Sequence, residues 1–281
     1  MSCEKALPIL IEAIKKNLEL WEKSEWKGEL IDIAPPVLWF GNFNSPEENV
    51  LTIGANPSRC EFLERDNERV CREPLKKPRF AALRGKEDLK SLLGNKKLLE
   101  KIIDSYNSYF EVNPYSGWFG IKDGGKVEGF VNGLSGSFYK DSKNGRRYTA
   151  IHTDLFPFAT LSNFQKIQRD VERDLFKTGW ANKTLSSIVQ LIRPKAIVVF
   201  AEFNEIQYRR LIRNLWSHEL SETFQFRDGK NEPYDIKLTV GKSYEGIPTA
   251  LIDLYLGNPI GANICTLNEF GKFIGEKLNI M

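Results

Sequence analysis

Residues 49–57, with the sequence NVLTIGANP, decide the fold class of this chain. The apolar and β-branched residues at the start predict a buried strand, and the glycine and Asn-Pro pair that follow end it. Similar apolar runs occupy 37–40, 148–158, 195–200 and 249–256. Helical periodicity is found at 1–23, 86–110, 164–192, 204–220 and 267–278, and a hairpin pattern at 221–247. Strands that alternate with helices predict an α/β fold, with a mostly parallel central sheet flanked by helices on both faces.

Composition sets the class of protein. The chain has 281 residues, of which 41% are hydrophobic, 12% aromatic and 27% charged, as in ordinary globular proteins. We expect a single domain with an N-terminal helix at 1–23 and an inserted helical and Gly-rich segment at about 86–147. No apolar run approaches the ~20 residues of a membrane helix, and the N-terminus lacks the pattern of a secretory signal. A cytoplasmic monomer that does not bind membranes is therefore the expectation.

The cysteines and phosphate-binding motifs bear on cofactors. The four cysteines include no C-x-x-C pair, and the sequence contains no Walker-type loop. We therefore expect neither a metal nor any other cofactor.

Charge is unevenly distributed along the chain. The net charge is only +3, but residues 69–86 hold seven basic residues against one acid, Glu73, a local charge of +6. Residues 140–147 hold four basic residues against Asp141, a local charge of +3. Such clusters neutralise phosphates in nucleic-acid-binding proteins, although charged loops are also common on soluble proteins in general.

Strand ends are the places to look for a site, because ligands bind at the carboxyl ends of strands in α/β sheets. Gly54-Ala55-Asn56-Pro57 follows one strand, Asp154 lies near the end of a second, and Asn258-Pro259-Ile260-Gly261 follows a third. Their order and spacing resemble the uracil-DNA glycosylase superfamily, in particular its mismatch-specific branch with the motifs G-x-N-P and N-P-S-G. The resemblance spans residues 48–275 and implies hydrolysis of the N-glycosidic bond of a flipped base.

The resemblance implies a role for both asparagines. Asn56 would hold and aim a water, because an amide is not a general base at neutral pH, and Asn258 would assist as the residue of the last motif. Gly54 and Pro57 would shape the base pocket. Positioning then matters more than proton abstraction, because the departing base and the oxocarbenium-like transition state carry the charge.

The resemblance implies that Asp154 recognises the base, at a position where many family members have asparagine. An ionised aspartate only accepts hydrogen bonds, so it would meet an exocyclic amino group, whereas a protonated one in an apolar pocket would accommodate uracil. Capping of the turn before Pro157 is the structural alternative. We expect His152 to be a hydrogen-bonded strand residue and not a catalyst.

Aromatic and basic residues complete the predicted DNA site. Phe62 and Phe80 are the candidates for a platform under the flipped base, with Trp118 and Phe119 as rivals. The remaining predicted DNA contacts are the cations Lys76, Lys77, Arg79 and Arg84 and the loop residues Ile260 and Gly261, with Ile264 as a second wedge candidate. Ile260 replaces the serine of the family motif.

These features predict a DNA glycosylase-like hydrolase in base excision repair, acting on mismatched or single-stranded DNA. Two alternatives stay open. One is a catalytically silent nucleic-acid-binding module of the same fold, and the other is an enzyme that processes a free nucleoside or nucleotide.

Overall fold

The computed structural model describes residues 2–65, 71–81, 83–142, 146–200, 216–227, 233–243, 245–253 and 264–281. The chain divides into two compact units, each built from three separate stretches. Unit 1 comprises Met1–Asn42, Ala55–Pro114 and Thr153–Leu191, and unit 2 comprises Phe43–Gly54, Tyr115–His152 and Ile192–Met281. The single-domain organisation expected from length stays a prediction.

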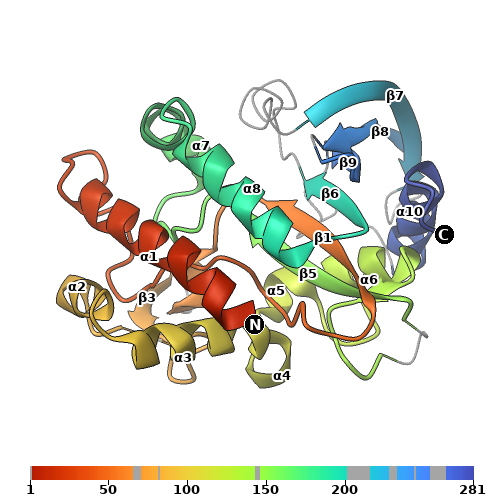
Figure 1. Ribbon diagram of the computed structural model, residues 1–281. Coiled ribbons are helices and arrows are strands. Elements are labelled where there is room, and N and C mark those ends of the chain that lie inside the picture. The colour runs from red at the N-terminus through yellow and green to blue at the C-terminus, as the bar shows by residue number, and fades with distance from the viewer. Residues whose placement is uncertain are drawn as a thin grey trace. The chain divides into compact units, whose positions relative to one another are not determined.

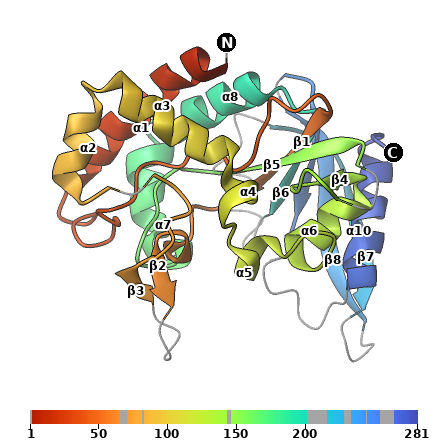
Figure 2. The ribbon, with the colours of Figure 1, turned by 90° about the horizontal axis from the view of Figure 1, so that it is seen from below.

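Unit 2 holds the central sheet, which has the order β4-β5-β1-β6-β9-β8-β7 (Figures 1 and 2). The pairs β4–β5, β1–β6 and β6–β9 are parallel, whereas β9–β8 and β8–β7 are antiparallel. The chain is therefore an α/β protein with a mostly parallel central sheet and helices around it, which confirms the predicted fold class. The strands are β1 Glu48–Gly54, β4 Gly136–Ser137, β5 Tyr148–Asp154, β6 Ala196–Phe200, β7 Trp216–Arg227, β8 Pro233–Ser243 and β9 Pro248–Ile252.

Strand β6 shows why the apolar runs became the middle of the sheet. All five of its residues are buried, and it pairs with β1 on one side and β9 on the other. A strand covered on both faces has no polar side, so its sequence is a continuous apolar run and not an alternation. Strand β1 follows the same rule, with buried residues from Asn49 to Gly54.

Two helices of unit 2 pack at unusually close range, α6 (Lys126–Gly133) and α10 (Ile264–Lys277) (Figures 1 and 2). A Cβ atom placed on Gly133 would collide with the carbonyl oxygen of Asn268, and one on Gly271 with that of Phe130. The two glycines let the backbones of the helices touch. The short helix α5 (Ser116–Phe119) is the other helix described in this unit.

Unit 1 is mainly helical. Helix α1 confirms the N-terminal helix predicted at 1–23, and it packs beside α2 and α3 (Figure 2). The strands β2 and β3 form a separate antiparallel hairpin. The elements are α1 Ser2–Trp21, η1 Arg59–Glu61, β2 Leu63–Arg65, β3 Cys71–Pro74, α2 Lys86–Leu92, α3 Lys96–Asn107, α4 Tyr109–Val112, α7 Phe164–Val171, η2 Glu172–Phe176 and α8 Trp180–Ile192.

The helix predicted over 86–110 is three helices, α2, α3 and α4. The break between α2 and α3 lies at Gly94 and Asn95, and the side chain of Asn95 caps α3 by accepting from the N–H of Leu98 at 3.1 Å. Asparagine is a favoured N-cap because its side chain satisfies a helix N–H that otherwise has no partner. Apolar periodicity continues through the cap, which is why the pattern alone did not show the break.

The strand predicted at 37–40 is wrong. Val37–Phe40 is buried and extended, but it belongs to none of the strands of the sheet. The N–H of Val37 donates to the carbonyl oxygen of Pro157. A ladder cannot continue from this contact, because Pro35, Pro36 and Pro157 have no N–H to donate. The prolines on both segments prevent a regular ladder, and what remains is an isolated bridge at Phe40 and individual hydrogen bonds such as that from Thr153 Oγ1 to Leu38 O at 2.7 Å.

The segment at 86–147 is helical as expected, but it is divided between the two units at Pro114. Its end also supplies β4, which pairs with β5 at one edge of the sheet. The expected helix at 204–220 lies mostly outside the described residues. Its last part is wrong, because Trp216–Leu220 belongs to β7 and pairs with β8 across the predicted hairpin.

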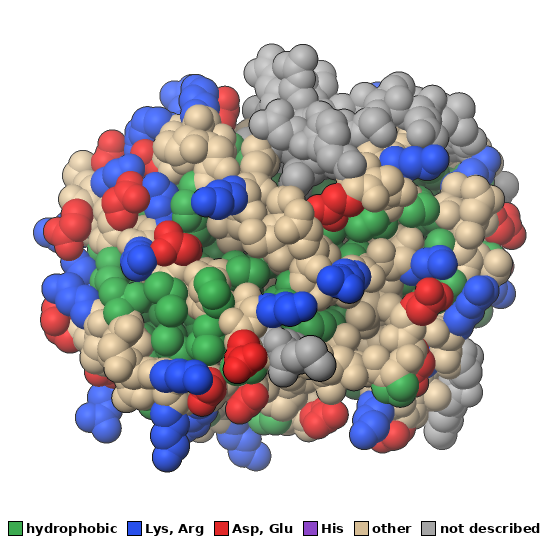
Figure 3. Space-filling view, in the orientation of Figure 1, with side chains coloured by type: hydrophobic (Ala, Val, Ile, Leu, Met, Phe, Trp, Pro, Cys, Tyr) green, Lys and Arg blue, Asp and Glu red, His purple; other side chains and the backbone are tan. Residues whose placement is uncertain are grey.

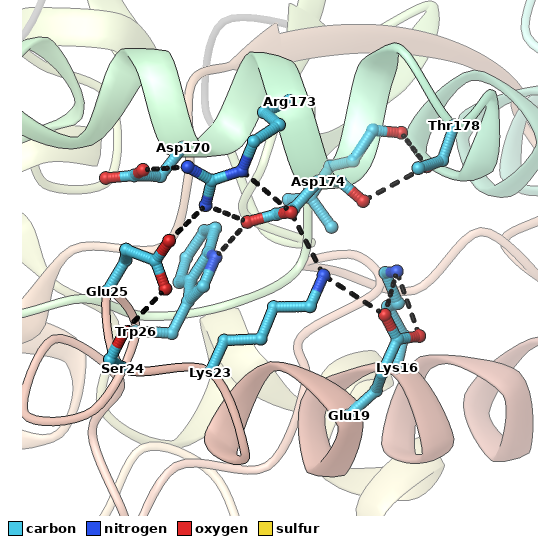
Figure 4. A network of polar contacts seen from close by, with 11 residues as sticks. Lys16, Glu19, Lys23, Ser24, Glu25, Trp26, Asp170, Arg173, Asp174 and Thr178 are labelled. Atoms are coloured by element: carbon cyan, nitrogen blue, oxygen red, sulfur yellow. Dashed lines mark hydrogen bonds and ion pairs between the residues drawn. The ribbon is translucent and has the colours of Figure 1, made fainter.

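A polar network ties α1 and the turn after it to the segment between α7 and α8 (Figure 4). The carboxylate of Asp174 in the π-helical turn η2 accepts from Lys23 at 3.0 Å, from Trp26 Nε1 at 2.7 Å and from Arg173 at 2.6 Å. Burial alone would raise the pKa of Asp174, but these hydrogen bonds hold it below its usual value. The network joins residues about 150 positions apart in the chain.

The surface carries both signs of charge. On the face shown in Figure 3, Lys and Arg side chains lie interspersed with Asp and Glu side chains. Within the described part of the chain, no helix is both long enough and apolar enough to cross a membrane.

Candidate functional site

Asn56 lies two residues beyond β1, in unit 1, and its side chain is half-buried. Its amide nitrogen Nδ2 donates to the carbonyl oxygen of Phe158 at 3.2 Å and to Thr160 Oγ1 at 3.1 Å, with a longer contact of 3.4 Å to Pro57 O. Among the described residues, none donates a hydrogen bond to Oδ1 of Asn56. The amide therefore has a fixed nitrogen end and an oxygen end available to a water.

Residues 157–161, which accept the hydrogen bonds of the Asn56 amide, are also hydrogen-bonded on the side away from Asn56. The N–H of Ile31 donates to Ala159 O at 3.2 Å, and the N–H of Leu161 donates to Glu29 O at 2.8 Å. On the side of Asn56, Arg59 Nη1 donates to Leu161 O at 2.7 Å. The carbonyls of this extended segment thus bond in two opposite directions. A segment bonded on both sides is a rigid support for Asn56.

Asp154 is the last residue of β5 and is buried, at 5% exposure. It belongs to unit 1, as Asn56 does, and precedes the segment that Asn56 contacts. Asp154 lies near a second buried carboxyl group, that of Glu61, whose pKa is raised mainly by burial and to a smaller extent by Asp154. The two acids lie at the same part of unit 1.

Glu61 is a residue that the motifs did not reveal. It ends the η1 turn directly after the Asn56-Pro57 pair and is 3% exposed. Its Oε2 accepts from the hydroxyl of Tyr109 at 2.7 Å and lies 3.7 Å from Nε of Arg79. Burial raises the pKa of Glu61 to about 8, against the opposing effects of Tyr109 and Arg79. The only sequence signal was an acid beside two apolar residues, Phe62 and Leu63.

The raised pKa of Glu61 predicts a pH-dependent stability. A carboxyl group whose pKa is higher in the folded state stabilises the fold at low pH, and this contribution is lost as pH rises from the unfolded value toward about 8. Because of Glu61, the free energy of unfolding of the unmodified protein should fall by ~3 kcal/mol between pH 4.5 and pH 7. We expect Glu61→Gln, whose side chain stays neutral, to lack this fall. Urea unfolding of both proteins at several pH values measures the difference.

The matched control is Glu73→Gln, at an exposed acid of β3. Burial also raises the pKa of Glu128 in unit 2, to about 7, so only the difference between variant and unmodified protein isolates Glu61. Parallel pH curves for Glu61→Gln and the unmodified protein would show that the pKa of Glu61 is the same in the folded and unfolded states.

The two predicted platform residues are core residues of unit 1. Phe62 and Phe80 are each 4% exposed and stack on each other with centroids 5.6 Å apart. Phe80 also stacks on Tyr109 at 4.9 Å. Tyr109, on which Phe80 stacks, donates its hydroxyl proton to Glu61 and so connects the rings to that acid. Neither Phe62 nor Phe80 presents an open face to solvent. Their role in base binding stays a prediction.

The rival aromatic residues lie in unit 2 around His152. The ring of Phe119 meets His152 edge-on at 5.3 Å, and Trp118 lies 6.2 Å from it. Nδ1 of His152 is 2.9 Å from Thr52 Oγ1 on β1, and the imidazole is buried. His152 is thus a hydrogen-bonded strand residue, in agreement with the sequence interpretation.

The predicted DNA-binding cations differ in exposure. Lys76, Lys77 and Arg84 are exposed, whereas Arg79 has a side chain only 13% exposed and donates to Cys60 O at 2.8 Å. Arg79 therefore lies against Glu61 in the interior, and the three other cations are exposed to solvent.

The last motif cannot be placed. Asn258, Ile260 and Gly261 lie outside the described residues, as do the other residues at 254–263, and Ile264 is described only as the first residue of α10. Gly54, the last residue of β1, and Pro57, three residues beyond it, are described, and both are buried. Within the described ranges, no three His, Cys, Asp or Glu side chains are grouped to hold a metal ion.

The chain was compared with protein-family models, curated proteins and solved structures, and none of them matches it.

Proposed function

We propose that the protein is a DNA glycosylase-like hydrolase that releases a damaged or deaminated base flipped out of DNA. One observation carries the proposal. The amide of Asn56, from the first strand-end motif, is hydrogen-bonded to the backbone and side chain of the segment that follows Asp154, from the second. A water-holding residue and a base-reading residue at neighbouring points of unit 1 are what this reaction needs.

The chemistry follows from the geometry of Asn56. Its Oδ1 accepts a hydrogen bond from a water and directs the oxygen lone pair of that water toward the sugar. The bond between the sugar carbon and the base nitrogen breaks, and its electron pair leaves with the base. The water oxygen then bonds to the sugar carbon and releases a proton to solvent or to the departing base. Positioning of this kind replaces proton abstraction, which an amide cannot perform at neutral pH.

The protonation state of Asp154 would select the base. A protonated carboxyl donates and accepts, which fits the carbonyl and N–H of uracil, whereas an ionised one only accepts and fits an exocyclic amino group. The two alternatives therefore predict different substrates. Uracil and hypoxanthine, which carry a carbonyl beside a ring N–H, test the protonated form, and mismatched bases with an exocyclic amino group test the ionised form.

The test is a base-release assay with oligonucleotides that contain uracil, hypoxanthine or a mismatch, in single-stranded and double-stranded form. We expect an abasic product, detected as alkali-sensitive cleavage. No release from any substrate would contradict the proposal. Salt-sensitive DNA binding without an abasic product would favour a silent binding module, and release from free nucleosides that duplex DNA does not inhibit would favour a nucleoside enzyme.

The exposed lysines after the first motif predict a second result. We expect the double substitution Lys76→Ala and Lys77→Ala to weaken DNA binding ~10-fold and to lower the slope of log Kd against log salt by about 2, because two phosphate contacts are lost. Both residues keep their backbone hydrogen bonds in the variant, since Lys76 N donates to Glu64 and Lys77 O accepts from Asn113. Fluorescence anisotropy at several salt concentrations measures both quantities.

The control is the double substitution Lys96→Ala and Lys97→Ala, which removes the same charge from two exposed positions on α3. Equal effects of the two double substitutions would mean that general charge, and not the 76–77 position, attracts DNA.

A further inference from the structure

The hydroxyl of Thr160 has only one way to contact Asn56. Thr160 is 2% exposed, and its Oγ1 donates to the carbonyl of Ser162 at 2.8 Å. A hydroxyl carries one proton, so toward Asn56 the same oxygen is an acceptor. The 3.1 Å contact is therefore a hydrogen bond from Nδ2 of Asn56 to Thr160.

The second N–H of the Asn56 amide is directed at an atom that cannot donate, the carbonyl oxygen of Phe158. If the amide rotated by half a turn, Oδ1 would face that carbonyl oxygen and a hydroxyl whose proton is already used. Two hydrogen bonds would be replaced by two repulsive oxygen contacts in a partly buried place. The structure thus selects one orientation of a side chain whose two ends have nearly the same shape.

Ser162 is held in turn by Glu29. Its N–H donates to Glu29 Oε2 and its hydroxyl to Glu29 Oε1, both at 3.1 Å. The Glu29 carboxylate thus satisfies both donors of Ser162. The carbonyl oxygen of Ser162 is the atom that accepts from Thr160. A continuous chain of hydrogen bonds therefore runs from the Asn56 amide through Thr160 and Ser162 to Glu29.

We propose that Thr160 is a positioning residue that makes Oδ1, and not Nδ2, of Asn56 the atom that meets the nucleophilic water. This inference rests on the proposed function of Asn56. It also limits that function, because Asn56 then accepts a proton of the water in a hydrogen bond and has no N–H left to donate to the departing base. The negative charge on the leaving base must be stabilised by other groups.

The kinetic test compares Thr160→Val, which keeps the shape and removes the hydroxyl, with Thr160→Ser, which keeps the hydroxyl. We expect Thr160→Val to lower kcat for base release ~30-fold with little change in KM, because substrate binding is intact and the water is misplaced. Thr160→Ser should stay within about 3-fold of the unmodified protein. Release by folded Thr160→Val at the unmodified rate would overturn the proposal.

A second measurement needs no activity. The side-chain NH₂ resonances of Asn56, assigned in ¹⁵N spectra by their loss in Asn56→Ala, should exchange with solvent ~10-fold faster in Thr160→Val than in Thr160→Ser, because one hydrogen bond of the NH₂ group is lost. Unchanged exchange would overturn the inference, whatever the enzyme assay shows. Absence of base release by the unmodified protein would instead count against the proposed function alone. If Thr160→Val does not fold, Thr160→Ala is used in its place, because a smaller side chain adds no volume to the buried site.

Discussion

Replacing Asn56 by alanine is expected to lower the rate of base release ~100-fold or more while DNA binding changes by less than about 3-fold. The physical reason is that different residues of unit 1 are proposed for the chemical step and for DNA binding. In the proposed function, Asn56 supplies the acceptor that places a water, whereas the cations at 76, 77 and 84, which are exposed, supply the attraction for phosphate. Removal of the amide leaves those cations unchanged, so binding and chemistry should separate.

Single-turnover base release and anisotropy binding with the same oligonucleotide measure the two effects. The control is Asn107→Ala in α3, which removes another half-buried amide of unit 1, one that accepts from Trp39 Nε1 at 3.1 Å. Both variants lose a hydrogen-bonded asparagine, so a loss of stability alone would affect both. A loss of release in Asn107→Ala equal to that in Asn56→Ala would contradict the assignment of Asn56 as the water-holding residue.

The second large effect is on stability, at the contact between α6 and α10. We expect Gly271→Ala to lower the free energy of unfolding by about 3 kcal/mol, although alanine is the better helix former by about 1 kcal/mol. The added methyl group would collide with the carbonyl oxygen of Phe130 and lie 2.9 Å from the Cα of Gly133. These are backbone atoms of α6, so the two helices have to separate and their buried contacts loosen.

Gly94→Ala is the matched control for this substitution. A Cβ atom at Gly94 meets no other atom within 4 Å, and its backbone does not have the positive φ that disfavours other residues. We expect this variant to be within about 1 kcal/mol of the unmodified protein, or slightly more stable, because alanine restricts the unfolded chain. Denaturant unfolding of both variants decides the matter, and equal midpoints would show that α6 and α10 are not in close contact.

Local patterns were enough for much of the fold. The apolar runs at 49–54 and 195–200 predicted β1 and β6 because a strand covered on both faces needs no polar side, and that requirement is visible in the sequence. The hairpin of β7 and β8 and the helices α1 and α10 were predicted in the same way. The strand predicted at 37–40 was wrong, because the segment that Val37 contacts contains Pro157, and contact partners are not part of a local pattern.

The residues of the candidate site were singled out in part from the sequence. The motif at 54–57 singled out Asn56, and a strand end singled out Asp154. Glu61 was missed, because the local sequence around an acid that follows a turn is the same whether the acid is exposed or, like Glu61, buried. Thr160 was missed for a related reason, since its role depends on a contact with a residue 104 positions away.

By itself the sequence determined the fold class, the ends of β1 and β5 and the chemical type of residue found at them, because these depend on hydrophobicity and backbone preference over a few neighbouring positions. Only the tertiary structure decided how the amide of Asn56 is oriented, which cation meets Glu61 and which cations stay exposed. Those properties depend on hydrogen-bond partners and burial. Both are set by segments that are distant in the chain, and no local pattern encodes them.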